Sequence, residues 1–138
     1  MNICEFHVRK DDLTQASFVT RQSATMEGDV LVRIALFGLS ANNISYSSSS
    51  GPIDYWSFFL APEGWGNIPV WGIGEVVESR HEAVPAGERL FGYFPMATHL
   101  KIRAGNIGAH RITDVGEHRR HLSPVYNNYI RLCANTEY

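Results

Sequence analysis

Hydrophobic and polar residues alternate along most of this chain, in stretches of five to ten residues. The clearest stretch is 30–38, VLVRIALFG, in which Val30, Val32, Ile34 and Leu36 share one face. Successive side chains of a strand point to opposite faces, so we expect this aliphatic face to be core. The same reasoning predicts further strands at 3–8, 17–20, 69–77, 89–94, 97–103 and 107–112. Many short strands separated by turn residues favour an antiparallel β-barrel or sandwich.

Glycine and proline mark the places where the backbone bends or meets a neighbour. Gly72 and Gly74 lie inside the predicted strand 69–77. Glycine inside a strand typically marks a bulge or a close backbone approach. The segment 85–88, PAGE, predicts a turn, and Ser40 predicts the N-cap of a short helical turn. The predicted fold is therefore mostly β, with a few short helices.

The end of the chain has a different pattern from the strands. Residues 116–138 begin with charged side chains and then carry Tyr126, Tyr129 and Leu132 at helical spacing. We expect this segment to form a C-terminal helical extension or connector. With 138 residues, the chain has the length of a single domain, 1–138.

Composition and charge exclude several classes of function. The formal net charge of −2 provides no electrostatic reason to expect nucleic acid as a partner. No apolar run approaches the ~20 residues of a membrane-spanning helix, and the N-terminus has no apolar signal segment. Cys4 and Cys133 lie at opposite ends, which favours free thiols in a reducing cytoplasm. We expect a cytoplasmic protein that does not associate with membranes.

An aromatic cluster follows the low-complexity segment 47–52, SSSSGP. It consists of Tyr55, Trp56, Phe58, Phe59 and Trp65. Such a cluster is either a hydrophobic plug beneath a loop or the side of a ligand pocket. Both interpretations stay open on the sequence alone.

Histidines are the other candidates for chemistry. His99 could titrate near neutral pH, although a strand histidine that faces outward is usually only solvated. His118 and His121 have the spacing of helical metal ligands, but Arg119 and Arg120 between them repel a cation. We therefore expect a solvated basic face there and no metal site.

Three segments together resemble a known family. They are GDVLVRIALFGLSANN (28–43), IPVWGIGEVV (68–77) and PAGERLFGYFPMATHLKIRAGNI (85–107). Their order is similar to that of the GroES-like domain of medium-chain dehydrogenase/reductases. More closely, ANNISY, DYWSFF, EGWG, PVWG and PVYNNY resemble the DUF2855 group of quinone-oxidoreductase-like proteins. The resemblance extends over about 8–129 and implies a GroES-like antiparallel β-barrel.

The resemblance implies the substrate-side domain of a zinc-independent, NADPH-dependent enoyl or quinone-type reductase. In that family a separate Rossmann domain holds NADPH. Here Gly72-Ile73-Gly74 lacks the third glycine and the following helix, so we expect no cofactor bound by this chain alone. The zinc ligands of the family are also missing, because the corresponding regions read SANN and PVWG. The expected partners are a small-molecule substrate and either a Rossmann domain or a second copy of the chain.

The resemblance also implies candidate site residues. Asn42, Asn43 and Tyr46 would be catalytic, because an amide or phenol can donate a hydrogen bond to a substrate carbonyl. Asparagines that merely cap a turn are the alternative. The candidate substrate-pocket residues are Tyr55, Trp56, Trp65, Tyr93 and His99.

Two other classes of function stay open beside the reductase. A free-standing barrel could bind a small molecule, or act as a cyclase or isomerase, without a cofactor. An interaction module could instead form a dimer through the surface where the missing domain would dock.

Overall fold

The structure is a computed structural model that describes residues 2–39, 55–120, 122 and 124–132. Most of these residues lie in strands. The strands are β1 (Asn2–Arg9), β2 (Ala16–Gln22), β3 (Asp29–Gly38), β4 (Trp65–Asn67), β5 (Pro69–Ser79), β6 (Arg89–Pro95), β7 (His99–Gly105), β8 (Arg111–Asp114) and β9 (Asn128–Leu132). The described helices are η1 (Tyr55–Ser57), η2 (Glu117–Arg119) and α2 (Pro124–Asn127). No helix in this part of the chain is long and apolar enough to cross a membrane.

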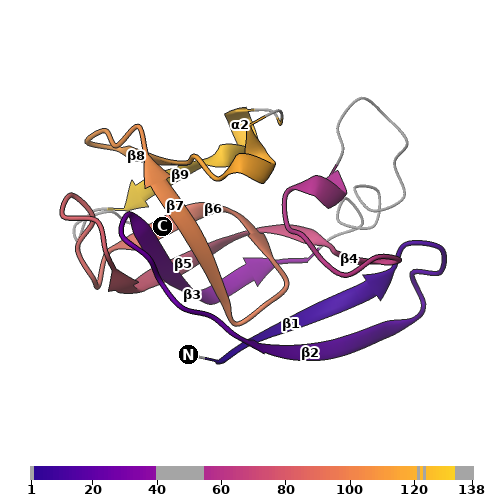
Figure 1. The fold of residues 1–138 in the computed structure, drawn as a ribbon. Coiled ribbons are helices and arrows are strands. Elements are labelled where there is room, and N and C mark those ends of the chain that lie inside the picture. The colour runs from indigo at the N-terminus through magenta and orange to yellow at the C-terminus, as the bar shows by residue number, and fades with distance from the viewer. Residues whose placement is uncertain (1, 40–54, 121, 123, 133–138) are drawn as a thin grey trace.

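Six strands form a closed antiparallel barrel (Figure 1). Their order is β3-β5-β6-β9-β8-β7, and β7 pairs again with β3. The antiparallel barrel that the alternating pattern predicts is therefore confirmed. Its interior is filled by Val30, Val32, Val70, Val76, Val84, Leu90, Phe94, Ile102, Ala104, Ile112 and Tyr129. Closure leaves these six strands without a free edge.

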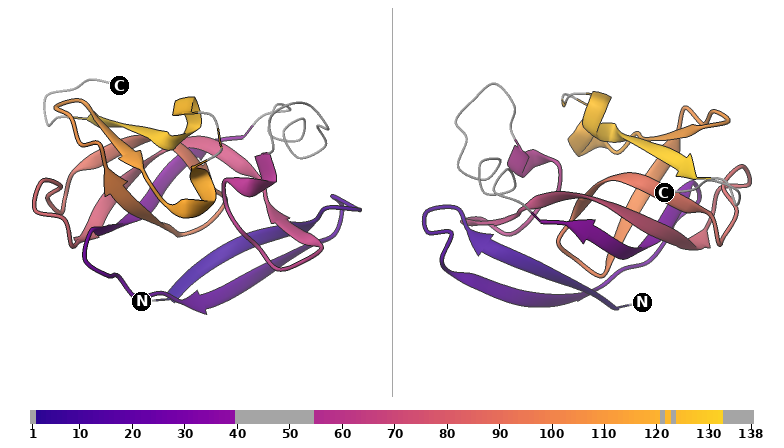
Figure 2. Two further views of the ribbon diagram at one scale, coloured as in Figure 1. Left: turned by 45° about the horizontal axis from the view of Figure 1, so that its top comes forward. Right: turned by 180° about the vertical axis from the view of Figure 1, so that it is seen from behind.

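A smaller three-stranded sheet, β2-β1-β4, lies beside the barrel (Figure 2). The segment between β6 and β7 joins the two. The Phe6 amide donates to the Met96 carbonyl at 2.9 Å, and the Thr98 amide donates to the Cys4 carbonyl at 2.8 Å. These bonds hold β1 against the barrel, while β2 forms the outer edge of the sheet.

The prediction of which β3 side chains are buried is only partly correct. Val30 and Val32 are buried, but Leu36 is 59% exposed. Leu31, on the other predicted face, is also buried. The pairing of β3 with β5 shifts register between Leu31 and Val32 and again between Ile34 and Leu36. Each irregularity interrupts the strict alternation on which the prediction relied.

The helix predicted over the C-terminal segment is wrong beyond Asn127. α2 is only four residues long, and β9 follows it directly. β9 pairs with both β6 and β8, and this pairing closes the barrel. Tyr129 is fully buried there. Backbone pairing and the burial of Tyr129 outweigh the helical spacing of Tyr126 and Tyr129. The strand predicted at 107–112 corresponds to β8, which begins only at Arg111.

Candidate ligand-binding site

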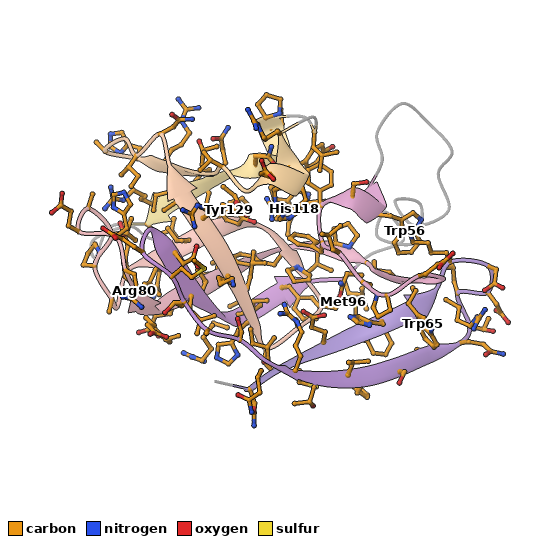
Figure 3. All side chains as sticks on the ribbon, viewed as in Figure 1. Trp56, Trp65, Arg80, Met96, His118 and Tyr129 are labelled. Atoms are coloured by element: carbon orange, nitrogen blue, oxygen red, sulfur yellow. The ribbon has the colours of Figure 1, made fainter. Side chains whose placement is uncertain are left out.

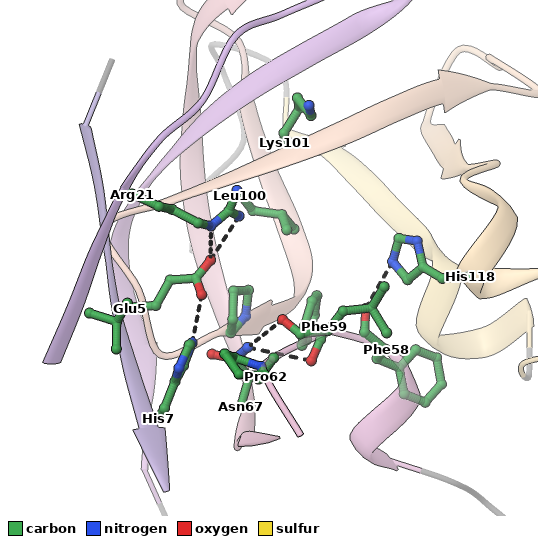
Figure 4. Close-up of a pocket in the computed structure, with 14 residues that line it drawn as sticks. Glu5, His7, Arg21, Phe58, Phe59, Pro62, Asn67, Leu100, Lys101 and His118 are labelled. Carbon is green, nitrogen blue, oxygen red and sulfur yellow. Dashed lines mark hydrogen bonds and ion pairs between the residues drawn. The ribbon is translucent and has the colours of Figure 1, made fainter. Parts of the chain in front are cut away.

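A pocket of about 470 Å³ opens where the three-stranded sheet meets the barrel (Figure 4). β1, β2 and β4 supply its polar side. The segment 58–62 supplies an apolar floor, and Pro95, Leu100, Lys101 and His118 complete the described lining. The volume is within the range of small-molecule sites, which is about 300–1,000 Å³.

The polar side follows from the alternation of strands. In β1, Ile3, Glu5 and His7 point to one face and are buried. The register places Val19 of β2 opposite Glu5, and Asn67 of β4 opposite His7. Directly paired residues share a face of the sheet. The sheet therefore presents its polar residues to the pocket as one group.

Glu5 is the centre of this group. Its Oε1 accepts a hydrogen bond from Arg21 Nε at 2.9 Å, and Arg21 Nη2 lies 2.8 Å from the same oxygen in the ion pair. Its Oε2 lies 2.7 Å from His7 Nε2. The Glu5 and His7 side chains are almost fully buried, whereas that of Arg21 is half-exposed. A buried carboxylate needs such partners, and here both oxygens have one.

Asn67 holds the floor against the sheet. Its Nδ2 donates to the carbonyls of Phe59 at 3.4 Å and Leu60 at 3.2 Å. The side chain is 1% exposed, and its Oδ1 accepts no hydrogen bond from the described residues. Two carbonyl acceptors require the NH₂ group on their side, so the amide orientation is defined.

The floor is aromatic. Phe58 and Phe59 are buried and line the pocket. Their rings contact Tyr93, with centroids 5.3 Å and 6.0 Å away. Tyr93 belongs to the same buried cluster but does not line the pocket. These ring contacts stabilise the position of the floor residues, because tilted aromatic pairs at these distances are favourable.

The opposite side carries two further basic residues. Lys101 Nζ donates to the Ala24 carbonyl at 3.2 Å. His118 Nε2 lies 3.2 Å from the Phe58 carbonyl oxygen. Burial lowers the pKa of His118, an effect that Asp114 partly offsets. A neutral His118 therefore donates its Nε2–H to Phe58 near neutral pH.

This arrangement can bind a small, mostly apolar molecule and exchange a proton with it. The carboxylate of Glu5 orients the His7 ring, as in many acid–base pairs. No group of three potential metal ligands occurs among the described residues. With Glu5 between Arg21 and His7, the site is suited to hydrogen bonding and proton transfer.

The predicted catalytic residues Asn42, Asn43 and Tyr46 lie outside the described residues, as does the side chain of Tyr55. Trp56 and Trp65 lie near one end of β4, where Lys10 and Arg9 approach their rings (Figure 3). Neither tryptophan is among the lining residues of the pocket. The structure therefore does not unite the five predicted pocket residues around this pocket.

His99 also lies outside this pocket. Its Nδ1 is 2.9 Å from Thr98 Oγ1, and it pairs with Arg33 across β7 and β3. Burial, and then the positive charge of Arg33, lower the pKa of His99. His99 is only partly buried. It is thus partly solvated, as expected for a strand histidine that faces outward, and it also has a hydrogen-bond partner in Thr98.

The solvated basic face expected at 118–121 is wrong for Arg119. This residue is 1% exposed, and its Nε lies 3.3 Å from Asp114 Oδ2. Its guanidinium also lies over the Phe59 ring, 4.8 Å from the centroid. The planar group can stack and pair at once, which permits burial of the charge.

Sequence reasoning missed Glu5, His7, Arg21 and Asn67. One signal was present, because Glu5 and His7 alternate with Cys4 and Phe6 on the same face as Ile3. Two ionisable residues on the apolar face of a strand indicate a paired buried site. Arg21 and Asn67 become recognisable only when the strand register is known.

The fold and the pocket define a class: a small antiparallel β-barrel protein with a ligand-sized cavity beside the barrel. Residues 37–138 match the model of a family described as "Protein of unknown function (DUF2855)". The match covers more than half of the chain, and the chain belongs to the DUF2855 family. No curated protein matches the chain.

Proposed function

We propose that this chain is the substrate-binding barrel of a zinc-independent, NADPH-dependent reductase of enoyl or quinone-type substrates. The observation that carries the proposal is the pocket, with an aromatic floor and the buried Glu5–His7 pair on one side. Conjugated rings fit aromatic floors, and reduction of a carbonyl requires a proton donor. The resemblance to the GroES-like domain of medium-chain dehydrogenase/reductases supports the same assignment.

We infer that the described residues do not hold NADPH by themselves. The described helices have three or four residues, and none follows a glycine-rich turn of the kind that holds a pyrophosphate. In this proposal a Rossmann domain, in the same polypeptide or in a partner, binds the cofactor. A cytoplasmic location is part of the proposal, since Cys4 is a free thiol.

The residues of this chain act on the substrate. Phe58 and Phe59 bind the conjugated ring and exclude water. Protonated His7 donates a proton to the substrate oxygen that gains negative charge, and regains a proton from solvent. Glu5 stabilises the imidazolium while it is charged. Asn42, Asn43 and Tyr46, following the resemblance, would orient the substrate carbonyl.

A cofactor-independent isomerase or binding protein is the second candidate. The Glu5–His7 pair favours it, because proton transfer between two positions of a ligand needs only an acid–base group. A dimerising interaction module is the third, favoured by Leu36 and Leu39, which are exposed at the end of β3.

Binding is tested first, by NMR titration of the purified chain with duroquinone, a fully substituted quinone that does not alkylate thiols, and with 2-cyclohexenone. We expect saturable binding of at least one of them. Ala61→Phe, which fills the pocket, should weaken that binding at least tenfold. Ala109→Phe, at an exposed position away from the pocket, should leave it unchanged. Binding that resists Ala61→Phe would contradict the pocket assignment.

The reductase is tested separately on the protein isolated from its source, together with whatever it is joined or bound to. This preparation should oxidise NADPH in the presence of the ligand that the chain binds. Binding without NADPH oxidation would reject the reductase and favour the cofactor-independent candidate. Neither binding nor oxidation would favour the interaction module.

A further inference from the structure

The polar side of the pocket contains a buried hydrogen-bond acceptor, Asn67 Oδ1, that no described residue satisfies. From it we infer that the ligand is a hydroxylated aromatic ring, such as a phenol or hydroquinone, whose hydroxyl hydrogen is donated to Asn67 Oδ1 while its oxygen lies beside His7. This inference rests on the proposed function in one respect, because both require the pocket to be a ligand site. It narrows the substrate class from enoyl or quinone compounds to the quinone–hydroquinone type.

Asn67 provides this acceptor. Its Nδ2 is committed to the carbonyls of Phe59 and Leu60, which leaves Oδ1 facing elsewhere. Oδ1 is buried and has no hydrogen-bond partner among the described residues. A buried acceptor without a donor costs about 1–3 kcal/mol. A donor from a ligand would remove this cost.

His7 lies next to this acceptor and can act on the same hydroxyl group. Arg21 keeps Glu5 an acceptor, so the His7 Nε2 next to Glu5 carries a hydrogen. In the protonated ring of the proposed function, Nδ1 also carries a hydrogen and can donate it to the oxygen of that hydroxyl group. No hydrogen bond to His7 Nδ1 occurs within the described part of the chain. His7 and Asn67 lie directly opposite each other on β1 and β4, as Figure 4 also indicates.

The charges around the pocket select a hydroxyl over an ammonium donor. Arg21, Lys101 and Glu5 all line the pocket; Arg21 is paired with Glu5, so the uncompensated charge is that of Lys101, which repels a cationic donor. Phe58 and Phe59 provide an aromatic floor for the ring that carries the hydroxyl. A neutral aromatic hydroxyl therefore matches the Asn67 acceptor, the aromatic floor and the charge of the pocket together.

Two isomers that differ in one hydrogen-bond donor test the inference. 4-Ethylphenol has a hydroxyl group, whereas 4-methylanisole has the same atoms but no donor. NMR titration of the wild-type chain should give at least about tenfold tighter binding of 4-ethylphenol, because a site built for a hydroxyl discriminates against its absence. In Asn67→Ser this preference should fall below about threefold.

Asn127→Ser is the matched control. Asn127 is also a buried asparagine, and its Nδ2 donates to the Arg119 carbonyl at 3.0 Å. It does not line this pocket. Its substitution should lower thermal stability without changing the preference between the two isomers. A similar fall in preference in both variants would overturn the role of Asn67.

The failure of this inference can be distinguished from that of the proposed function. If both isomers and duroquinone bind but the isomers bind equally, hydroxyl recognition is wrong and the pocket assignment stands. If the preference is present in the wild type but survives Asn67→Ser, the inference is also wrong. If none of the three compounds binds, both the inference and the pocket assignment fail.

Discussion

Arg119 illustrates how one residue can connect several parts of this molecule. Its Nη2 donates to the Tyr129 hydroxyl at 2.9 Å, and its Nη1 donates to the Tyr126 carbonyl at 3.3 Å. It also forms the ion pair with Asp114, which is 3% exposed. A buried arginine of this kind is stabilising only while all its partners remain in place. Its neighbour Arg120 is exposed and has only a loose contact with Glu117.

Arg119→Met should lower the free energy of unfolding by about 3–5 kcal/mol, because it leaves the Asp114 carboxylate buried without its partner. Arg120→Met should change it by less than about 0.5 kcal/mol, since exposed ion pairs contribute little. Urea denaturation of the two variants compares adjacent arginines directly. Equal effects would contradict the special role of Arg119.

Tyr129 gives the chain a predicted sensitivity to alkaline pH. Burial raises the pKa of Tyr129 to about 12, compared with about 10 for an exposed tyrosine. Between these values the unfolded chain loses a proton that the folded chain keeps, so stability falls as pH rises. We expect a loss of about 1 kcal/mol between about pH 9 and pH 11 from this residue.

The measurement is urea denaturation at both pH values, with Tyr129→Phe as the control. The phenylalanine variant has no hydroxyl to ionise, so its stability should fall less over this interval. Its stability at pH 9 should be lower than that of the wild type, because the hydrogen bonds to Arg119 and to the Tyr93 carbonyl are lost. The same pH slope in both proteins would argue against a buried, protonated Tyr129.

At the scale of elements, the pairing of β3 with β5 depends on close backbone approach. A Cβ at Gly72 would lie 2.4 Å from the Leu36 carbonyl oxygen, and one at Gly74 would lie 2.4 Å from Val32 Cγ1. The sequence-based expectation that these glycines mark a close approach is confirmed. Gly38, on the partner strand, has no atom of the described residues within 4 Å of such a Cβ.

Gly72→Ala should therefore destabilise the chain by about 1–3 kcal/mol, since a backbone atom cannot move aside cheaply. Gly38→Ala should be neutral or stabilising by up to about 1 kcal/mol, because alanine restricts the unfolded chain. Thermal and urea denaturation of both variants provide the comparison. If Gly72→Ala left the free energy of unfolding unchanged, β3 and β5 would have to be able to separate locally.

At the scale of the whole molecule, the barrel and the three-stranded sheet should differ in local stability. The barrel is closed and encloses the main core, whereas β2 is a largely exposed edge strand. Regions with few buried contacts open at lower free energy than the core. The pocket lies at the junction, so its polar side belongs to the sheet that we expect to open at lower free energy.

Hydrogen exchange followed by NMR should show this difference. We expect amides of β2 such as Phe18 to exchange at least about a hundredfold faster than core amides of β5 and β6 such as Val70 and Leu90. A ligand in the pocket should slow exchange in β1 and β2, because binding stabilises the folded state. Equal protection in both regions would mean that sheet and barrel unfold as one unit.

Strand positions and fold class were predictable because alternation is a local property of the chain. The seven predicted strands all have counterparts in the structure, and the antiparallel barrel is correct. β4 was not predicted, and β9 was taken for helix. Both are short, with five residues or fewer, and they exist because neighbouring strands offer them backbone hydrogen bonds. The spacing of hydrophobic and polar side chains along the chain does not show which strands will offer these hydrogen bonds.

The sequence by itself determined seven of the nine strands, the turns between them and the antiparallel β class, since side-chain alternation and turn chemistry act between neighbours in the chain. It also contained, in the alternation of 3–8, the signal that Glu5 and His7 share a face with Ile3. Only the tertiary structure decided that Arg21, Asn67 and Phe58 meet them in one pocket. It also decided that Arg119 is buried. These outcomes depend on strand register and barrel closure, which join residues far apart in the sequence.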